Sequence, residues 1–379
     1  MNRKRRTVLL VCEYGTLNGG ERSLLAAIDQ LSTDEFRLVA LAPAEGGLAE
    51  SLAARNIEVR SLELYGSTGV RIELQRVRGQ LATHIAEVRP DLIHANSVST
   101  SRWTGPVASQ AAVPSVGHLR DIAKLSRQAI ADIGLNSRLL AVSAATRAAF
   151  VHQGLPAENI HVAFNGVDPI EFCPRDRTGR LHDELGLPPG APLILTIGQI
   201  GIRKGLDVLL DAAAEVQRRH PQTHWLIVGR RHSRKDEAVT FEHELHQQAA
   251  QPELAGHVHF LDERSDVPIL LNEATLIVHA ARQEPLGRVL LEAAASGCAI
   301  VATEVGGTAE IFPAGLAAAV LVPPDAPSTL ARSIDSLLAD APRRKSLGGA
   351  ARERALTEFD VAATTNRLVE HYTDCSAVT

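Results

Sequence analysis

Short apolar runs rich in branched residues alternate with amphipathic stretches along nearly the whole 379-residue chain. The runs are apolar without a break, a pattern typical of strands buried on both faces of a sheet. The stretches between them, such as Gly205–Arg219 and Leu286–Ser296, carry apolar residues at helical spacing. Strands and helices that alternate in this way form parallel sheets covered by helices. The sequence therefore predicts an α/β protein.

The predicted strands fall into two series. The first comprises Thr7–Tyr14, Arg37–Ala42, Glu58–Leu64, Asp91–Asn96, Ser115–Leu119, Leu139–Ser143 and Ile160–Ala163. The second comprises Leu193–Gly198, His224–Gly229, Val258–Leu261, Leu276–Ala280, Ala299–Thr303 and Ala319–Val322. Two series predict two doubly wound, Rossmann-like domains that face each other across a cleft, with a ligand at the carboxyl ends of the strands.

The segment between the two series, Asp168–Pro192, is rich in proline, glycine and charge, which is typical of a connection. We expect an amino-terminal domain over residues 1–172, a linker over 173–191 and a carboxyl-terminal domain over 192–357. The last residues, 358–379, follow no further strand, and most of them are predicted to be helical.

Composition excludes several classes of function. The net charge is −5 and aromatic residues make up 3%, so a nucleic-acid partner is not expected. The four cysteines are scattered without a CxxC pair, which favours a reducing compartment over a disulfide framework. No set of His, Cys, Asp or Glu has the spacing of metal ligands, so no metal is expected.

The amino terminus bears on localisation. Its apolar run, Val8–Cys12, is too short for the core of a signal peptide, so we expect a cytoplasmic protein. The basic cluster Arg3–Arg6 would allow peripheral contact with anionic lipid at the inner face of the membrane. The simpler interpretation of the cluster is a solvated tail.

Three strand-to-helix turns carry residues suited to an anionic, hydroxylated ligand. Gly19 and Gly20 precede a predicted helix, where backbone N–H groups can approach an anion. Arg203 and Lys204 follow a strand of the second series and suit a diphosphate. In EPLGRVLLE, Pro285 suits the first turn of a helix, so we expect Glu284 at the helix start and Glu292 about two turns further on.

Polar side chains also end two strands of the first series. His94, Asn96, His118, Arg120 and Asp121 are therefore expected together at the carboxyl edge of the first sheet.

In order along almost the whole chain, these segments resemble the family 4 glycosyltransferases, retaining, nucleotide-sugar-dependent enzymes of the GT-B fold. The resemblance is carried by GGERSLL (Gly19–Leu25), DLIHANS (Asp91–Ser97), LLAVSAATR (Leu139–Arg147), FNGVD (Phe164–Asp168), IGQIGIRKGLDVLLDA (Ile197–Ala212), WLIVG (Trp225–Gly229), EPLGRVLLEAAASG (Glu284–Gly297) and VATEVGGTAEIF (Val301–Phe312). The resemblance also implies that the last helix returns to the amino-terminal domain.

The resemblance implies a binding role for each matching position. The donor diphosphate would be bound by Gly19, Gly20, Arg203, Lys204, Gly287 and Arg288. The donor sugar would be bound by Glu284, Pro285, Leu286 and Gly287, and the ribose by Glu292. The base would be bound by Gly229, Arg230, Leu261 and Arg264. His118 and Glu284 are the implied catalytic residues, and no cofactor or metal is implied.

This chain departs from the family pattern at three places. Gln199 stands where the family often has an arginine, which removes one cation from the diphosphate site. Leu286 replaces a frequent phenylalanine, and His279–Gln283 replaces a more usual Pro-Ser pair.

The implied activity is transfer of a hexose-type sugar from a nucleoside-diphosphate sugar, UDP-sugar rather than GDP-mannose, to a hydroxyl acceptor. The acceptor would be a saccharide, a lipid-linked molecule or a small molecule, in cell-surface polysaccharide or glycolipid synthesis. Retention would follow from metal-independent attack on the same face that the diphosphate leaves. Two alternatives stay open: a nucleotide-sugar 2-epimerase of similar fold, and a catalytically silent nucleotide-sugar-binding protein.

Overall fold

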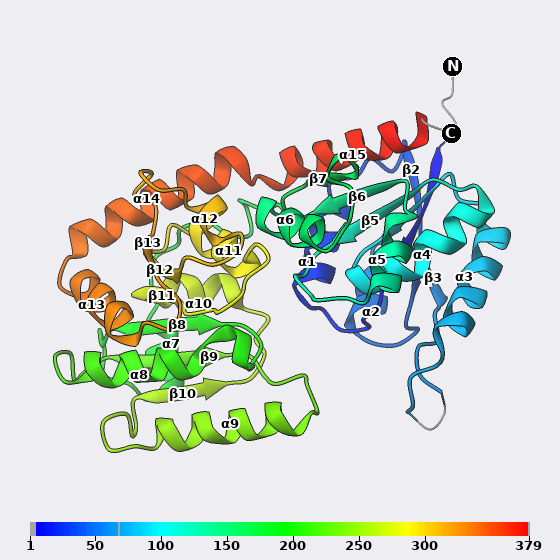
Figure 1. The fold of residues 1–379 in the computed structure, drawn as a ribbon. Coiled ribbons are helices and arrows are strands. Elements are labelled where there is room, and N and C mark those ends of the chain that lie inside the picture. Colours follow the sequence, from blue (N-terminus) through cyan, green and yellow to red (C-terminus); the bar gives the residue numbers. More distant parts are fainter. Residues whose placement is uncertain (1–4, 67–68, 378–379) are drawn as a thin grey trace. The chain divides into compact units, whose positions relative to one another are not determined.

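The computed structural model describes residues 5–66 and 69–377 (Figure 1). The chain forms two compact units. The first contains the residues up to Gly166 and those from Val361 onward, and the second is Val167–Asp360. Each unit is built on one sheet, and every strand pair in both sheets is parallel.

The sheet of the first unit has seven strands in the order β3-β2-β1-β4-β5-β6-β7. Their bounds are β1 Arg6–Val11, β2 Phe36–Ala42, β3 Glu58–Ser61, β4 Leu92–Ala95, β5 Ser115–Leu119, β6 Arg138–Ala141 and β7 Ile160–Val162. The first series of predicted strands is thereby confirmed. The alternation of side chains across the strands supplies two apolar faces, and each face is covered by helices.

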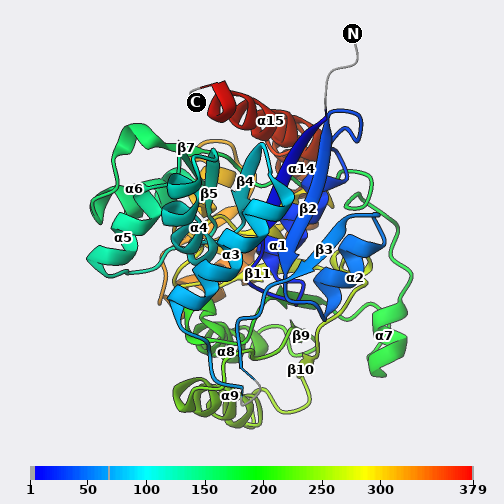
Figure 2. The ribbon, with the colours of Figure 1, turned by 90° about the vertical axis from the view of Figure 1, so that its right-hand side faces the viewer.

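One face of this sheet is covered by α1 (Gly19–Ile28) and α15 (Val361–Ala377), whose apolar residues share a core cluster with β1 and β5. The other face is covered by α3 (Leu74–Val88) and α4 (Val98–Ala111), which pack on β1 and β4 (Figure 2). The remaining helices of the unit are α2 Gly47–Ala53, α5 Arg127–Gly134 and α6 Ala144–His152.

The sheet of the second unit has six strands in the order β10-β9-β8-β11-β12-β13, the Rossmann order. Their bounds are β8 Leu193–Ile197, β9 His224–Val228, β10 Val258–Leu261, β11 Leu276–His279, β12 Ile300–Thr303 and β13 Val320–Val322, which confirms the second series. The helices are α7 Arg180–Leu185, α8 Leu206–Gln217, α9 Asp236–Ala249, α10 Val267–Glu273, α11 Arg288–Ala295, α12 Thr308–Ile311, α13 Pro327–Leu338 and α14 Ala341–Glu358.

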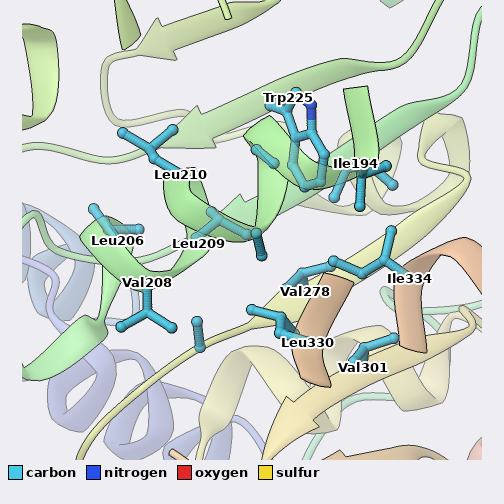
Figure 3. Close-up of a cluster of buried hydrophobic side chains, with 14 of the residues drawn as sticks. Ile194, Leu206, Val208, Leu209, Leu210, Trp225, Val278, Val301, Leu330 and Ile334 are labelled. Atoms are coloured by element: carbon cyan, nitrogen blue, oxygen red, sulfur yellow. The ribbon is translucent and has the colours of Figure 1, made fainter. Parts of the chain in front are cut away.

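A core cluster of the second unit lies between its sheet and helices α8 and α13 (Figure 3). Trp225 of β9 and Leu209 of α8 are each 1% exposed, and Leu330 and Ile334 of α13 close the cluster. Burial of this apolar face fixes α8, and with it the turn that precedes α8 at the carboxyl edge of the sheet.

The segment 173–191, expected as a linker, belongs to the second unit in the structure. Its backbone is tied to helix α10, because Glu273 accepts hydrogen bonds from the N–H groups of Thr178 and Gly179, at 2.6 and 3.1 Å. Leu181 of α7 is buried. The apolar and polar contacts of this segment make it a docked part of the unit, although its proline, glycine and charge content is typical of a free connection.

Candidate active site

The Glu284 loop connects β11 to α11 in the second unit. Pro285 was expected in the first turn of the helix, and that expectation is wrong, since α11 begins at Arg288. Gly287, with a φ of +105°, precedes the helix in a conformation that favours glycine. Glu284 therefore lies in the loop, and Glu292 lies in the second turn of the helix.

Glu284 is buried and shares one oxygen between two partners. Its Oε2 lies 2.5 Å from Nζ of Lys204 and 2.8 Å from Nε2 of His279. Lys204 comes from the turn before α8, and His279 is the last residue of β11. The side chains of Lys204 and Glu284 are only 12% and 9% exposed, so water screens this pair weakly.

The charges of this group follow from its surroundings. Burial alone would raise the pKa of Glu284, but the Lys204 ammonium and the His279 hydrogen bond outweigh it and hold that pKa well below its usual range. Burial lowers the pKa of His279, and Lys204 lowers it further against the opposing effect of Glu284. The group is thus an ionised carboxylate between an ammonium and a neutral imidazole.

Close backbone contacts hold the loops of this group together. Gly205, at φ +61°, packs so tightly that an added Cβ would lie 2.0 Å from the carbonyl oxygen of Ala280. Gly306, at φ +52°, packs in the same way on the carbonyl oxygen of Glu284, and the N–H of Gly307 donates to that oxygen at 3.0 Å. Only glycine fits positions that combine a positive φ with contacts this short.

Glu292 is paired within its own helix. Nε of Arg288 lies 2.5 Å from Oε1 of Glu292, and both side chains are at most 19% exposed. Nη1 of Arg288 is buried and has no hydrogen-bond partner among the described residues. A buried guanidinium N–H without a partner is costly and points to a ligand atom or water that would accept from it.

A pocket of about 260 Å³ lies beside the Lys204 turn. It is lined by residues 199–204 together with Ser233, Lys235, Glu237 and Ala238. Gln199, the departure from the family pattern, and Arg203 both line it, and Arg203 is exposed. The pocket therefore offers cations to an anionic ligand next to Glu284.

The four residues expected at the base are brought together only in part. Gly229 and Leu261 are joined because the N–H of Gly229 donates to the carbonyl oxygen of Leu261 at 2.9 Å, and Arg230 pairs with Glu263 at 3.0 Å. Arg264 instead forms ion pairs with Glu184 of α7 and with Asp266. These ion pairs occupy the guanidinium of Arg264, and the one with Glu184 connects it to α7.

In the first unit, His94 and His118 lie one residue before the carboxyl ends of β4 and β5, at the edge of the sheet where they were expected. Both are buried, and their rings stack with centroids 5.3 Å apart. Nε2 of His94 lies 3.2 Å from Nδ1 of His118, and Nδ1 of His94 lies 2.5 Å from the hydroxyl of Tyr372. Side-chain alternation in β5 places His118 on the same face as Val116, which packs in the cluster under α15.

The acid–base properties of the two imidazoles follow from this burial. The pKa of His94 is lowered to about 3 by burial and by the charge of Arg120, and the same causes, in the same order, hold the pKa of His118 well below its ordinary value. The two rings are neutral near pH 7. The catalytic role implied for His118 stays a prediction.

Arg120 is the cation that reaches the edge of the first sheet. Its guanidinium donates to Oδ1 of Asn96 at 2.9 Å and to Oδ1 of Asn165 at 2.6 Å. An added Cβ on Gly20 would lie 3.2 Å from Cδ of Arg120, so this stem passes the start of α1. The role of Asn165 was missed in the sequence analysis, although its place directly after a strand, in FNGVD, was the available signal.

Among the described residues, no three His, Cys, Asp or Glu side chains form a group that could hold a metal ion. Within the same part of the chain, no helix combines the length and apolar character that crossing a membrane requires.

Two family profiles match successive parts of the chain. Residues 17–171 match the profile described as Glycosyltransferase Family 4, and residues 178–354 match Glycosyl transferases group 1. The chain belongs to the family 4 glycosyltransferases.

Curated relatives are about 30% identical in sequence to this chain over the matched segments. Alpha-maltose-1-phosphate synthase of Mycobacterium tuberculosis is 32% identical over 250 residues, which are 62% of this chain and 62% of that protein. D-inositol 3-phosphate glycosyltransferase of Corynebacterium aurimucosum is 30% identical over 64% of this chain and 58% of its own length. The match thus spans about three fifths of these relatives.

Solved structures resemble the whole chain. Anabaena HepE, in a crystal structure with UDP and glucose, superposes with a TM-score of 0.85 and 25% identity, over 98% of this chain and 100% of that one. Sucrose-phosphate synthase of Thermosynechococcus elongatus has a TM-score of 0.80 at 20% identity over 99% and 100% of the two chains. This likeness identifies the two Rossmann-like sheets as the GT-B fold.

Proposed function

We propose that this protein transfers a glucose-type hexose from a UDP-sugar to a hydroxyl group of an acceptor, with retention of the anomeric configuration. The observation that carries the proposal is the buried group of Lys204, Glu284 and His279. A fixed carboxylate next to a cation suits a ligand that has hydroxyls beside a diphosphate. The crystal structure of HepE with UDP and glucose supports UDP as the nucleotide.

Each residue of the second unit would then have a distinct part. Glu284 accepts hydrogen bonds from the sugar hydroxyls, and Glu292 accepts them from the ribose hydroxyls. Lys204 and Arg203 meet the charge that develops on the diphosphate as the bond to the sugar breaks. Since Gln199 supplies no charge, the exposed Arg203 takes its share of this task.

The stereochemistry follows from the placement of carboxylates. The Oε2 atom of Glu284 is held by two donors, and Oε1 of Glu292 is paired with Arg288, so we assign neither carboxylate as a nucleophile. We therefore favour attack by the acceptor hydroxyl on the face from which the diphosphate leaves, with a phosphate oxygen taking the proton. Gly19, Gly20 and His118 belong to the first unit, and their contributions are part of the proposal.

The acceptor, we propose, is a saccharide or a lipid-linked or small hydroxylated molecule. Peripheral contact with anionic lipid would be made by the basic amino terminus. Arg5 and Arg6 are described, and Arg5 Nη2 donates to the carbonyl oxygen of Phe36 at 3.2 Å. Arg3 and Lys4 lie outside the described residues.

Thermal unfolding with UDP, GDP, ADP and their hexose conjugates tests this proposal, because a ligand of the folded state raises the melting temperature. We expect a rise with UDP and UDP-glucose that EDTA does not abolish. A rise in melting temperature only with GDP-mannose or only with ADP-glucose would contradict the proposal, and so would the absence of a rise with every nucleotide tested.

Turnover separates transfer from the two alternatives. A 2-epimerase would convert UDP-hexose without an acceptor, and a silent binding protein would leave it unchanged in every mixture. Transfer predicts UDP release that depends on an added hydroxyl acceptor.

A further inference from the structure

His279, the second partner of Glu284, belongs to the buried group that supports the proposed function, but none of the proposed binding roles falls to it. His279 ends β11, with a side chain only 3% exposed, and its Nε2 lies 2.8 Å from Oε2 of Glu284. The preceding residues of β11 are buried and apolar. A polar ring at the end of such a strand costs free energy unless its hydrogen bond is made.

The direction of this hydrogen bond follows from the charge of its acceptor. The carboxylate of Glu284 is ionised, and an ionised carboxylate accepts only. Nε2 of His279 must therefore carry the proton that is shared with Oε2. Because the ring is neutral, it orients the Glu284 carboxylate through this hydrogen bond without placing a second positive charge beside Lys204.

Lys204 and His279 differ in what they can do when a ligand arrives. The ammonium of Lys204 is at the end of a flexible stem and is attracted to a diphosphate. His279, by contrast, carries its imidazole on a short side chain at the end of strand β11, among buried residues. If Lys204 moves to a phosphate, His279 is the partner that still holds Glu284.

We propose that His279 is a positioning residue, which keeps the Glu284 carboxylate oriented toward the sugar hydroxyls while Lys204 exchanges Glu284 for the diphosphate. This inference rests on the proposed function. It predicts that His279 governs recognition of the sugar and leaves recognition of the nucleotide alone.

The test is titration calorimetry of UDP-glucose and of UDP with four proteins: the wild type, His279→Leu, His279→Gln and His182→Leu. His279→Leu removes the donor at similar volume, and His279→Gln keeps an N–H at similar reach. His182 is a matched control, since it is also buried in the second unit and its Nε2 lies 2.9 Å from the carbonyl oxygen of Ala191, before β8 begins.

For His279→Leu we expect affinity for UDP-glucose to fall by about tenfold or more, the value of a hydrogen bond to a charged group. Affinity for UDP should stay within about twofold, which also reports that the site is folded. His279→Gln should recover most of the loss, and His182→Leu should keep the wild-type ratio of the two affinities.

Two results would overturn the inference. One is an equal loss for UDP and UDP-glucose in His279→Leu, or a wild-type ratio in that variant. The other is the same deficit in His279→Gln as in His279→Leu. If the wild type binds neither UDP nor UDP-glucose, the proposed function fails and this inference fails with it.

Discussion

Replacement of Lys204 by methionine leaves the Glu284 carboxylate buried without its countercharge. The pair is 2.5 Å long and its side chains are 12% and 9% exposed, so solvent replaces little of the lost attraction. Breaking a buried ion pair by removing one partner costs roughly 3–5 kcal/mol. We expect Lys204→Met to lower the free energy of unfolding of the second unit by about 3 kcal/mol at pH 8.

The pH dependence of this loss tests its electrostatic origin. In the wild type, the pKa of Glu284 is lower in the folded than in the unfolded protein. The ionised carboxylate therefore contributes its full stability at a pH above the unfolded pKa, and this contribution is lost as the pH drops through the folded pKa. In Lys204→Met, only the interaction with His279 still opposes burial, and we expect the pKa of Glu284 to rise above its unfolded value. The variant then loses stability as pH rises, so its deficit should shrink by about 1.4 kcal/mol per pH unit below the raised pKa.

Urea unfolding followed by tryptophan fluorescence measures this loss. The chain has two tryptophans, Trp225 in the core of the second unit and Trp103 in the first, so a Trp103→Phe background reports the second unit alone. The double variant Lys204→Met/Glu284→Gln removes the stranded charge and should recover most of the stability. A loss under about 1 kcal/mol, an equal loss at pH 5 and pH 8, or no recovery in the double variant would refute the reasoning.

Three further predictions concern single contacts. Tyr372→Phe removes the hydroxyl 2.5 Å from Nδ1 of His94, and urea titration should show a loss of about 1–3 kcal/mol in the first unit, whereas an unchanged midpoint would contradict it. Burial, opposed by Arg120, raises the pKa of Glu21 to about 7 from 4.5. The free energy of unfolding of the wild-type first unit should therefore fall as pH rises between these two values. Glu21→Gln should flatten this part of the plot of stability against pH, and an unaltered slope would count against the prediction. Gly205→Ala should weaken UDP binding at least tenfold in calorimetry, since its Cβ would lie 2.0 Å from a carbonyl oxygen, whereas Gly349→Ala in α14, with nothing within 4 Å, should bind as the wild type does.

The fold was predictable because a buried strand is recognisable from the apolar residues of its own short segment. Each strand of both sheets overlaps a predicted strand, and all but the short, polar β3 and the half-buried β10 carry buried residues, so the two sheets followed from pattern alone. The start of α11 was not predictable in the same way. Pro285 suits a helix, but the backbone of Glu284 is held by Gly306 and Gly307, which come later in the chain, and Gly287 adopts a positive φ.

The side-chain partners at the site depended on contacts that lie far apart in the sequence. Lys204 and Glu284 were each expected in a strand-to-helix turn, yet nothing local indicated that His279 would hold the same carboxylate as Lys204. For His118, alternation within β5 predicts which residues share its face. That α15 covers this face depends on the last helix packing on the first sheet, which no local pattern shows.

In the proposed function, the Lys204–Glu284 group and Glu292 together form a UDP-sugar site. Calorimetric titration of UDP-glucose in EDTA, with the wild type and Glu292→Gln, tests it most directly. We expect the wild type to bind UDP-glucose and Glu292→Gln to bind it at least tenfold more weakly, at a temperature where circular dichroism shows both free proteins to be folded. Equal affinity in the two proteins, or wild-type binding that requires a metal, would contradict it.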